Sequence, residues 1–308
     1  MTDGYRALRD SAAWLRLDSR GRLIARGRDS ARFLHNVTSN EVKKMAPGAG
    51  CYAFLLTAQG RIQADLHLLR FDSHFLIDTE PELRETVPRL ILKFKVADQI
   101  ELEDITGKTS SIAVEGPSAA AVLMACGAPV PEADNAHVAW GDDTVARISF
   151  TGQPGFRLYG PAERRMEWVS KLEAAGARPA TDEDARLVRI ENGKPRYGED
   201  IRETSLPQET QQMQAVSFSK GCYLGQEIVE RIRAQGRVNR KLVRIEVETP
   251  EPLAPGTKLT VQGAEAGEIT SSVFSPRAGK VLALAYVRSQ FAESGTALEA
   301  GPAAAAVR

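Results

Sequence analysis

The last third of the chain reads as a series of short strands with almost no helical pattern between them. Turn-forming proline and glycine residues separate four strand-like segments, which are Leu242–Val247, Lys258–Val261, Glu268–Val273 and Lys280–Val287. Regularly spaced strands joined by tight turns are typical of a small barrel or sandwich. We therefore predict a separate β domain over residues 237–308 that ends in a frayed, alanine-rich tail.

The first two thirds mix strand and helix patterns. The predicted strands are 14–17, 22–24, 51–57, 62–71, 74–78, 99–104, 111–114, 145–150 and 156–159, and helices are predicted to begin near Ser30, Thr79, Ser118 and Pro161. The first two strands flank a turn and are expected to pair as a hairpin. Pro88 is expected to kink or break its helix. Strands alternating with helices and hairpins define an α+β class.

Length and charge narrow the class of protein. The chain has 308 residues, about twice the ~150 residues of a usual domain, which predicts two or three domains. Lys and Arg number 40 and Asp and Glu number 40, which argues against a chain that is basic throughout and coats nucleic acid. No run approaches the ~18 apolar residues of a membrane-spanning helix. The arginine-rich N-terminus contains interspersed aspartates, so we expect structure there rather than a leader.

Cysteine usage points to a reducing compartment. The chain has three cysteines, Cys51, Cys126 and Cys222, and no pair has metal-ligand spacing. An odd, scattered set argues against a disulfide framework or a zinc site, and we expect a cytoplasmic protein. Cys51 and Cys126 lie in apolar patterns and are expected to be structural.

The least generic segment is Lys220–Glu227, with the sequence KGCYLGQE. Gly221 and Gly225 bracket Cys222 and Tyr223, and an amphipathic helix pattern follows. A helix that begins near residues 223–225 would place Cys222 at its N-terminus, where the helix dipole favours a thiolate. Lys220 would add a positive charge nearby. The alternative is a buried structural cysteine, and the residues alone leave both interpretations open.

A local excess of positive charge follows this motif. Between residues 220 and 241 the chain carries six cations and two acids, Lys220, Arg231, Arg233, Arg237, Arg240 and Lys241 against Glu227 and Glu230. Such a segment could bind a polyglutamate tail or a phosphate backbone. The alternative is an ordinary solvated helix face.

Two further clusters could form a pocket. In the first, Arg189–Asp200, Glu191 could accept paired N–H donors from a flat heterocycle and Tyr197 could stack on it. The alternative is a polar surface turn. In the second, Gln59–Asp65, the aspartate follows a turn and lies in a strand. The alternative for Asp65 is an outward-facing strand carboxylate.

Taken together, these motifs resemble the YgfZ-type folate-binding proteins, relatives of the glycine-cleavage T-protein, an aminomethyltransferase. KGCYLGQE, which ends in Gln226 and Glu227, resembles their signature. The similarity continues in order along most of the chain through Gly60–Asp65, Glu115–Leu123, Arg189–Glu209 and Gly267–Val287. The resemblance implies two interleaved α/β domains within residues 1–236, with 46–105 roughly the inserted one, and a C-terminal β-barrel over 237–308. A folate pocket would lie at the centre of this ring of three domains.

The resemblance also implies roles for individual residues. Glu191 and Tyr197 match positions that contact the pterin, Arg237 and Arg240 match a basic segment near the folate tail, and Asp65 matches a carboxylate near the reacting carbon. Ala64 stands where the T-protein has a second acid, and the T-protein lacks the cysteine of the KGC motif. These departures speak against aminomethyl transfer from a lipoyl arm.

The function implied is a folate-binding accessory protein for iron–sulfur proteins, including tRNA-modifying enzymes. Its cofactor would be tetrahydrofolate or a derivative, its partners Fe–S assembly proteins or client enzymes, and Cys222 its functional thiol. One cysteine cannot hold a cluster alone, so Cys222 would be a transient ligand, and we expect no permanent metal. The alternatives are a tetrahydrofolate-dependent aminomethyltransferase that relies on Asp65, and a tRNA-binding protein. Whether the chain is an enzyme stays open.

Overall fold

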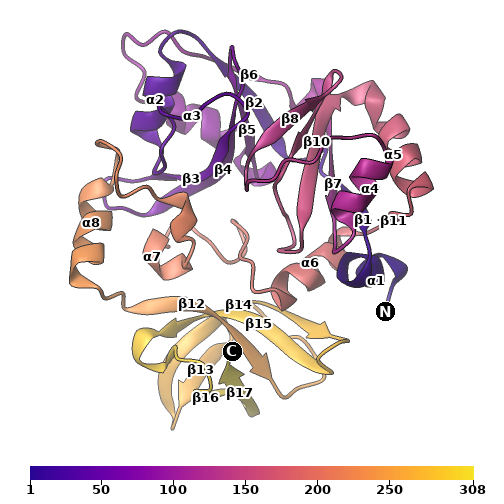
Figure 1. The fold of residues 1–308 in the computed structure, drawn as a ribbon. Coiled ribbons are helices and arrows are strands. Elements are labelled where there is room, and N and C mark those ends of the chain that lie inside the picture. The colour runs from indigo at the N-terminus through magenta and orange to yellow at the C-terminus, as the bar shows by residue number, and fades with distance from the viewer.

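The computed structural model describes residues 1–308 and divides them among two open sheets and a closed barrel (Figure 1). The α+β class and the C-terminal barrel predicted from the sequence are confirmed. The eight α-helices are α1 (Asp3–Asp10), α2 (Ser30–Val37), α3 (Thr86–Leu92), α4 (Ala119–Ala125), α5 (Arg165–Ala174), α6 (Asp182–Glu191), α7 (Pro207–Thr210) and α8 (Gln226–Gln235). None of these helices has the length and apolar character needed to cross a membrane.

The first sheet contains six strands. In spatial order they are β11 (Arg178–Pro179), β1 (Ala13–Arg16), β7 (Thr109–Glu115), β10 (Gly155–Pro161), β9 (Asp143–Ala146) and β8 (His137–Trp140). Helices α4 and α5 contribute apolar side chains to one core with this sheet, in which Trp168 is fully buried.

The second sheet contains five strands, all of which lie in the sequence between β1 and β7 of the first sheet. Its order is β3 (Gly50–Leu56), β4 (Ile62–Arg70), β5 (Phe75–Thr79), β2 (Gly21–Arg26) and β6 (Glu101–Asp104). Because β2 pairs with both β5 and β6, the inserted unit begins near residue 21 instead of residue 46. Its core of 26 buried residues also takes in Tyr197, Tyr223 and Val229 from much later in the chain.

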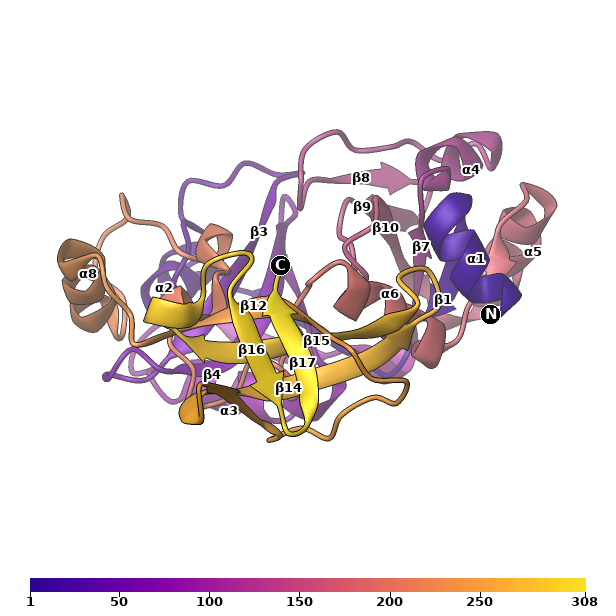
Figure 2. The ribbon, with the colours of Figure 1, turned by 90° about the horizontal axis from the view of Figure 1, so that it is seen from below.

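The barrel closes through its last strand. Its order is β12 (Arg240–Val247), β15 (Lys280–Arg288), β14 (Ala264–Ser275), β13 (Lys258–Val261), β16 (Ala297–Ala300) and β17 (Ala303–Val307). The expectation of a frayed tail is therefore wrong. β17 pairs with both β12 and β16, so its backbone groups are satisfied on both edges and no edge strand remains. Figure 2 views the molecule from the barrel side.

The predicted hairpin at residues 14–24 is also wrong, although both strands exist. β1 pairs with β7 in the first sheet and β2 pairs with β5 and β6 in the second. The fully buried guanidinium of Arg22 donates to the carbonyl oxygens of Leu17, Asp18 and Arg20. These bonds help to satisfy the carbonyls of the β1–β2 connection, which would cost free energy if they were buried without a partner.

Two helix boundaries differ from the prediction. The segment after Thr79 forms a short 3₁₀ turn, Pro81–Leu83, and the α-helix begins only at Thr86. Pro88 therefore lies in the first turn, where the missing N–H costs no hydrogen bond. Helix α1 was not predicted, although Thr2 caps it through a side-chain bond to the Tyr5 N–H.

Candidate functional site

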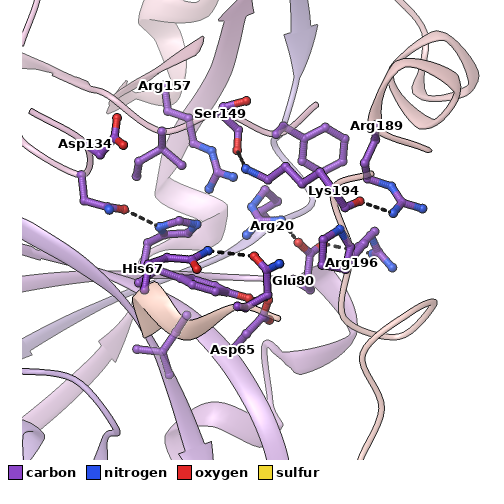
Figure 3. Close-up of a pocket in the computed structure, with 18 of the residues that line it drawn as sticks. Arg20, Asp65, His67, Glu80, Asp134, Ser149, Arg157, Arg189, Lys194 and Arg196 are labelled. Carbon is purple, nitrogen blue, oxygen red and sulfur yellow. Dashed lines mark hydrogen bonds and ion pairs between the residues drawn. The ribbon is translucent and has the colours of Figure 1, made fainter. Parts of the chain in front are cut away.

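A cavity of about 200 Å³ lies between the two open sheets (Figure 3). Strands β3 and β4 supply Tyr52, Asp65 and His67, and Glu80 follows β5. The opposite wall comes from the segment that precedes β10 and from β10 itself, with Ser149 and Arg157. Two later segments complete the lining with Arg189, Lys194, Arg196, Gln212 and Gln214. With Arg20 from the β1–β2 connection, residues from five separate stretches of chain thus meet at one place.

Asp65 presents a carboxylate to this cavity and is only 8% exposed. Its Oδ2 accepts the hydroxyl of Tyr52 at 2.7 Å. Burial and the nearby Glu80 carboxylate raise the pKa of Asp65 to about 7. A group that titrates near neutral pH can take up or release a proton during a reaction. The structure therefore supports the expected cavity position of Asp65 and not the outward-facing alternative.

His67 lies beside Asp65 as a neutral hydrogen-bonding group. Burial lowers the pKa of His67 well below its ordinary value, and its Nδ1 lies 2.8 Å from Oδ1 of Asn135. Its ring is 5.0 Å from that of Tyr52, centroid to centroid. An aromatic wall next to a carboxylate and a neutral imidazole suits a flat, nitrogen-rich ring.

A fully buried carboxylate, Asp78, fastens the two sheets together beneath the cavity. Arg20, from the β1–β2 connection, lies 2.7 Å from Oδ1 of Asp78, and Arg157 of β10 lies at the same distance from this oxygen. The Tyr159 hydroxyl donates to Oδ2 at 2.9 Å. Burial alone would raise the pKa of Asp78, but the two guanidinium groups outweigh it and hold the pKa well below its usual range.

Glu191 and Tyr197 do not line this cavity. The predicted tight loop is in part helix α6, and Glu191 is its last residue. The Glu191 Oε1 accepts the hydroxyls of Tyr5 and Ser275, so this carboxylate joins α1 to the barrel. The Tyr197 hydroxyl donates to the carbonyl of Gln63 at 2.7 Å, and its ring packs in the core of the second sheet. The aromatic and acidic side chains that do line the cavity include Tyr52, Asp65 and His67.

Cys222 is exposed and lies outside the central cavity. The helix after it, α8, begins at Gln226, and Gly225 caps it with φ +83°. The predicted placement of Cys222 at a helix N-terminus is therefore wrong, because a left-handed turn at Gly225 separates the two. Cys222 lines a separate cavity of about 480 Å³ together with Phe33, Phe94 and Tyr223.

Lys220 anchors the loop that carries Cys222. Its Nζ is buried and donates to the carbonyls of His35, Thr38 and Asn40 at the end of α2. Burial lowers the pKa of Lys220 to about 8. Gly221, Tyr223 and Gly225 follow, and Gly225 packs against the carbonyl of Thr57, where a Cβ would lie 2.5 Å away. Gln226 and Glu227 open α8, and the side chain of Glu227 is 86% exposed.

The other two cysteines differ from Cys222. Cys51 and Cys126 are both partly buried and free, and burial raises the pKa of the Cys51 thiol to about 12. A thiol that stays protonated is a poor nucleophile and a poor metal ligand, so Cys51 fits the structural role expected for it. Nowhere does the chain bring three or more His, Cys, Asp or Glu side chains into a group that could hold a metal ion.

The six cations of residues 220–241 do not form one face. Lys220 is buried, Arg231 and Arg233 pair with Glu227 and Glu230 on their own helix, and Arg240 pairs with Glu209 while its guanidinium lies 4.4 Å from the ring centroid of Tyr286. Arg237 and Lys241 lie beside a second, separate cavity. Arg240 and Arg237 are thus kept apart from the central cavity.

Comparison with known proteins gives the class that this architecture defines. Residues 1–220 match the family model described as the GCVT N-terminal domain, and residues 240–307 match the glycine cleavage T-protein C-terminal barrel domain. The chain therefore belongs to the GCVT family.

Among curated relatives, the aminomethyltransferase of Thermoanaerobacter pseudethanolicus is 26% identical over 307 residues, which cover 96% of this chain and 83% of that protein. The aminomethyltransferase of Rubrobacter xylanophilus is 29% identical over 92% of this chain and 78% of its own length. The solved structure of the glycine cleavage system aminomethyltransferase T from Bartonella henselae superposes with a TM-score of 0.89 at 21% identity, covering 99% of this chain and 87% of that one. This last likeness concerns the fold.

The raised pKa of Asp65 gives a prediction about stability. A carboxyl group whose pKa is higher in the folded chain than in the unfolded chain binds its proton more tightly when folded. Its favourable contribution is therefore complete below about pH 4 and is lost as the pH rises through about 7. Asp65→Asn cannot ionise. We expect Asp65→Asn to come close to the wild type in urea unfolding at pH 3.5 and to exceed it at pH 8, on the order of 1.4 kcal/mol for each unit of pKa shift.

An equal stability difference at both pH values would contradict this assignment. The matched control is Asp72→Asn, because Asp72 is exposed in the turn between β4 and β5. This surface substitution should stay within about 0.5 kcal/mol of the wild type.

Proposed function

We propose that the chain binds a tetrahydrofolate-type cofactor in the central cavity and serves as an accessory protein for iron–sulfur proteins, including tRNA-modifying enzymes. Cys222 is its functional thiol. The observation that carries this proposal is the separation of two features. A cavity lined mostly by polar side chains holds Asp65, while the exposed Cys222 lies on a loop outside it. Membership of the GCVT family supports the cofactor class.

The residues of the cavity fit a pterin ring. A pterin carries N–H donors along one edge, and the cavity offers the free Oδ1 of Asp65 and the imidazole of His67 as acceptors. Tyr52 supplies an aromatic surface beside both. Bound there, the cofactor would supply one-carbon chemistry, while Asp65 would hold or release a proton and Tyr52 would orient its carboxylate.

The exposed thiol fits a role toward a partner. A cluster needs about four protein ligands, and the chain gathers no such group, so a partner would supply the others. Lys220 fixes the base of the loop on α2 through three carbonyl contacts. The thiol is thereby presented at a defined place on the surface, where a partner's cysteine, sulfur or iron could meet it.

The test of the thiol is complementation of cells that lack this protein and show an Fe–S enzyme defect. We expect Cys222→Ala to lose rescue almost completely while its tetrahydrofolate affinity stays that of the wild type, because Cys222 does not line the central cavity. Cys126→Ala is the matched control and should rescue fully, because Cys126 ends α4 far along the chain from the motif. Full rescue by Cys222→Ala would remove the thiol from the proposal.

A second candidate function is tetrahydrofolate-dependent aminomethyl transfer. The observation in its favour is Asp65, whose carboxyl lies in the cavity with a pKa of about 7. The curated relatives named above carry that activity in their names. Turnover of an aminomethyl donor with tetrahydrofolate, lost in Asp65→Asn and retained in Cys222→Ala, would favour this function over the accessory role.

A further inference from the structure

A second cavity, of about 440 Å³, lies where helices α7 and α8 meet the barrel. Its walls come from α7 and the segment that follows it, from α8 and from the start of β12, and these three labelled elements lie next to one another in Figure 1. Lining residues include Gln211, Met213, Phe218, Arg233, Arg237 and Lys241. Junctions between domains are common places for small-molecule sites.

Every charged side chain that lines this cavity is a cation. Arg233 forms an ion pair with Glu230, in which Nη1 lies 3.4 Å from Oε2. Arg237 and Lys241 make no ion pair and no side-chain hydrogen bond, although the chain as a whole has a net charge of zero. Two unpaired cations beside a cavity that contains no carboxylate favour an anionic ligand, above all one that can accept several hydrogen bonds.

The rest of the lining suits a planar ring next to the anion. Phe218 has the guanidinium of Arg233 4.3 Å from its ring centroid, and Met213, Ile232 and Val238 add apolar surface. Gln211 is held in the left-handed region at φ +59°, a conformation that costs a non-glycine residue free energy and is concentrated at binding sites. Its side-chain Nε2 donates to the carbonyl of Gln208, which leaves one N–H and the Oε1 for the edge of a ring.

We propose that this second cavity binds a nucleoside phosphate, with Arg237 and Lys241 on the phosphate, Phe218 and Arg233 against the base and Gln211 at the base edge. An inorganic anion would leave the aromatic wall unused, and an aliphatic dicarboxylate would gain nothing from Phe218. Stacking on aromatic and arginine side chains together with cations on phosphate is the usual chemistry of nucleotide recognition. The same chemistry serves a free mononucleotide and one nucleotide of a single-stranded RNA.

The test is calorimetry on the full chain with adenosine 5′-monophosphate, inorganic phosphate and adenosine. We expect the mononucleotide to bind at least tenfold more tightly than either part. The double variant Arg237→Ala/Lys241→Ala should weaken its binding at least tenfold. Arg231→Ala is the matched control, because Arg231 lies on the adjoining helix α8 but does not line the cavity, and it should leave the affinity unchanged.

A six-nucleotide single-stranded RNA distinguishes the two sources. Tighter binding than the mononucleotide, with an affinity that falls steeply with salt and is lost in the double variant, identifies RNA. Equal or weaker binding identifies the free nucleotide. Binding of the mononucleotide no tighter than phosphate, or binding that the double variant leaves unchanged, would overturn the proposal.

Discussion

Replacing Asp78 with alanine is expected to lower the free energy of unfolding by about 3–5 kcal/mol, the usual cost of breaking a buried ion pair by removing one partner. The Asp78 carboxylate is fully buried and receives Arg20, Arg157 and the Tyr159 hydroxyl. Alanine would leave two buried guanidinium groups without this counter-charge. Urea unfolding at pH 7, followed by circular dichroism, measures the loss.

We expect Asp78→Ala to change the central cavity as well as to lower the stability of the fold. Arg20 and Arg157 both line the central cavity, so their release should also weaken ligand binding there. Asp72→Ala is the control, because Asp72 is exposed in the neighbouring turn and surface substitutions usually stay within about 0.5 kcal/mol. A loss below about 1 kcal/mol for Asp78→Ala would show that the two sheets do not depend on this carboxylate.

The second large effect is expected at Asp200, one of the residues that join the barrel to the rest of the chain. Its Oδ1 accepts the hydroxyls of Thr270 and Ser271 on β14, at 2.6 Å each. Its Oδ2 lies 2.6 Å from Arg189. Asp200 is fully buried, so Asp200→Ala should lower the free energy of unfolding by about 3 kcal/mol or more.

We expect Asp200→Ala to promote local opening at the barrel interface under conditions in which the rest of the chain stays folded. Amide hydrogen exchange should speed up first in β14, where the two hydroxyl contacts end. Asp200→Asn keeps the shape and one set of acceptors, and it should lose less than alanine does. Unchanged exchange in β14 of the alanine variant would contradict the role given to this contact.

Local patterns predicted much of the secondary structure. The strands over residues 51–57, 62–71 and 74–78 correspond to β3, β4 and β5 because turn residues and alternation determine them within a few positions. The partners of these strands depend on contacts distant in sequence. β1 pairs with β7 while β2 pairs with β5 and β6, and β17 pairs with β12 and β16 on either side.

The site was less predictable than the fold. Asp65 could be singled out because it follows a hairpin turn within a motif that resembles a known family. His67 shares its strand, but Glu80, Arg157 and Asn135 come from three other stretches, and no spacing rule connects them. Glu191 was misplaced because the segment around it reads as a polar turn, whereas the capping box at Thr181 and Asp184 begins a helix that carries Glu191 away from the cavity.

The central claim is that a tetrahydrofolate-type ligand occupies the cavity around Asp65. Its most direct test is calorimetry with tetrahydrofolate at pH 8, where the Asp65 carboxyl is largely ionised, on the wild type, Asp65→Asn and Glu191→Gln. Loss of a charge-assisted hydrogen bond of about 1.5–3 kcal/mol should weaken binding to Asp65→Asn some 10- to 100-fold. Glu191→Gln should bind as the wild type does, because Glu191 lies outside the cavity. No binding to the wild type, or a loss in Glu191→Gln with none in Asp65→Asn, would contradict the account.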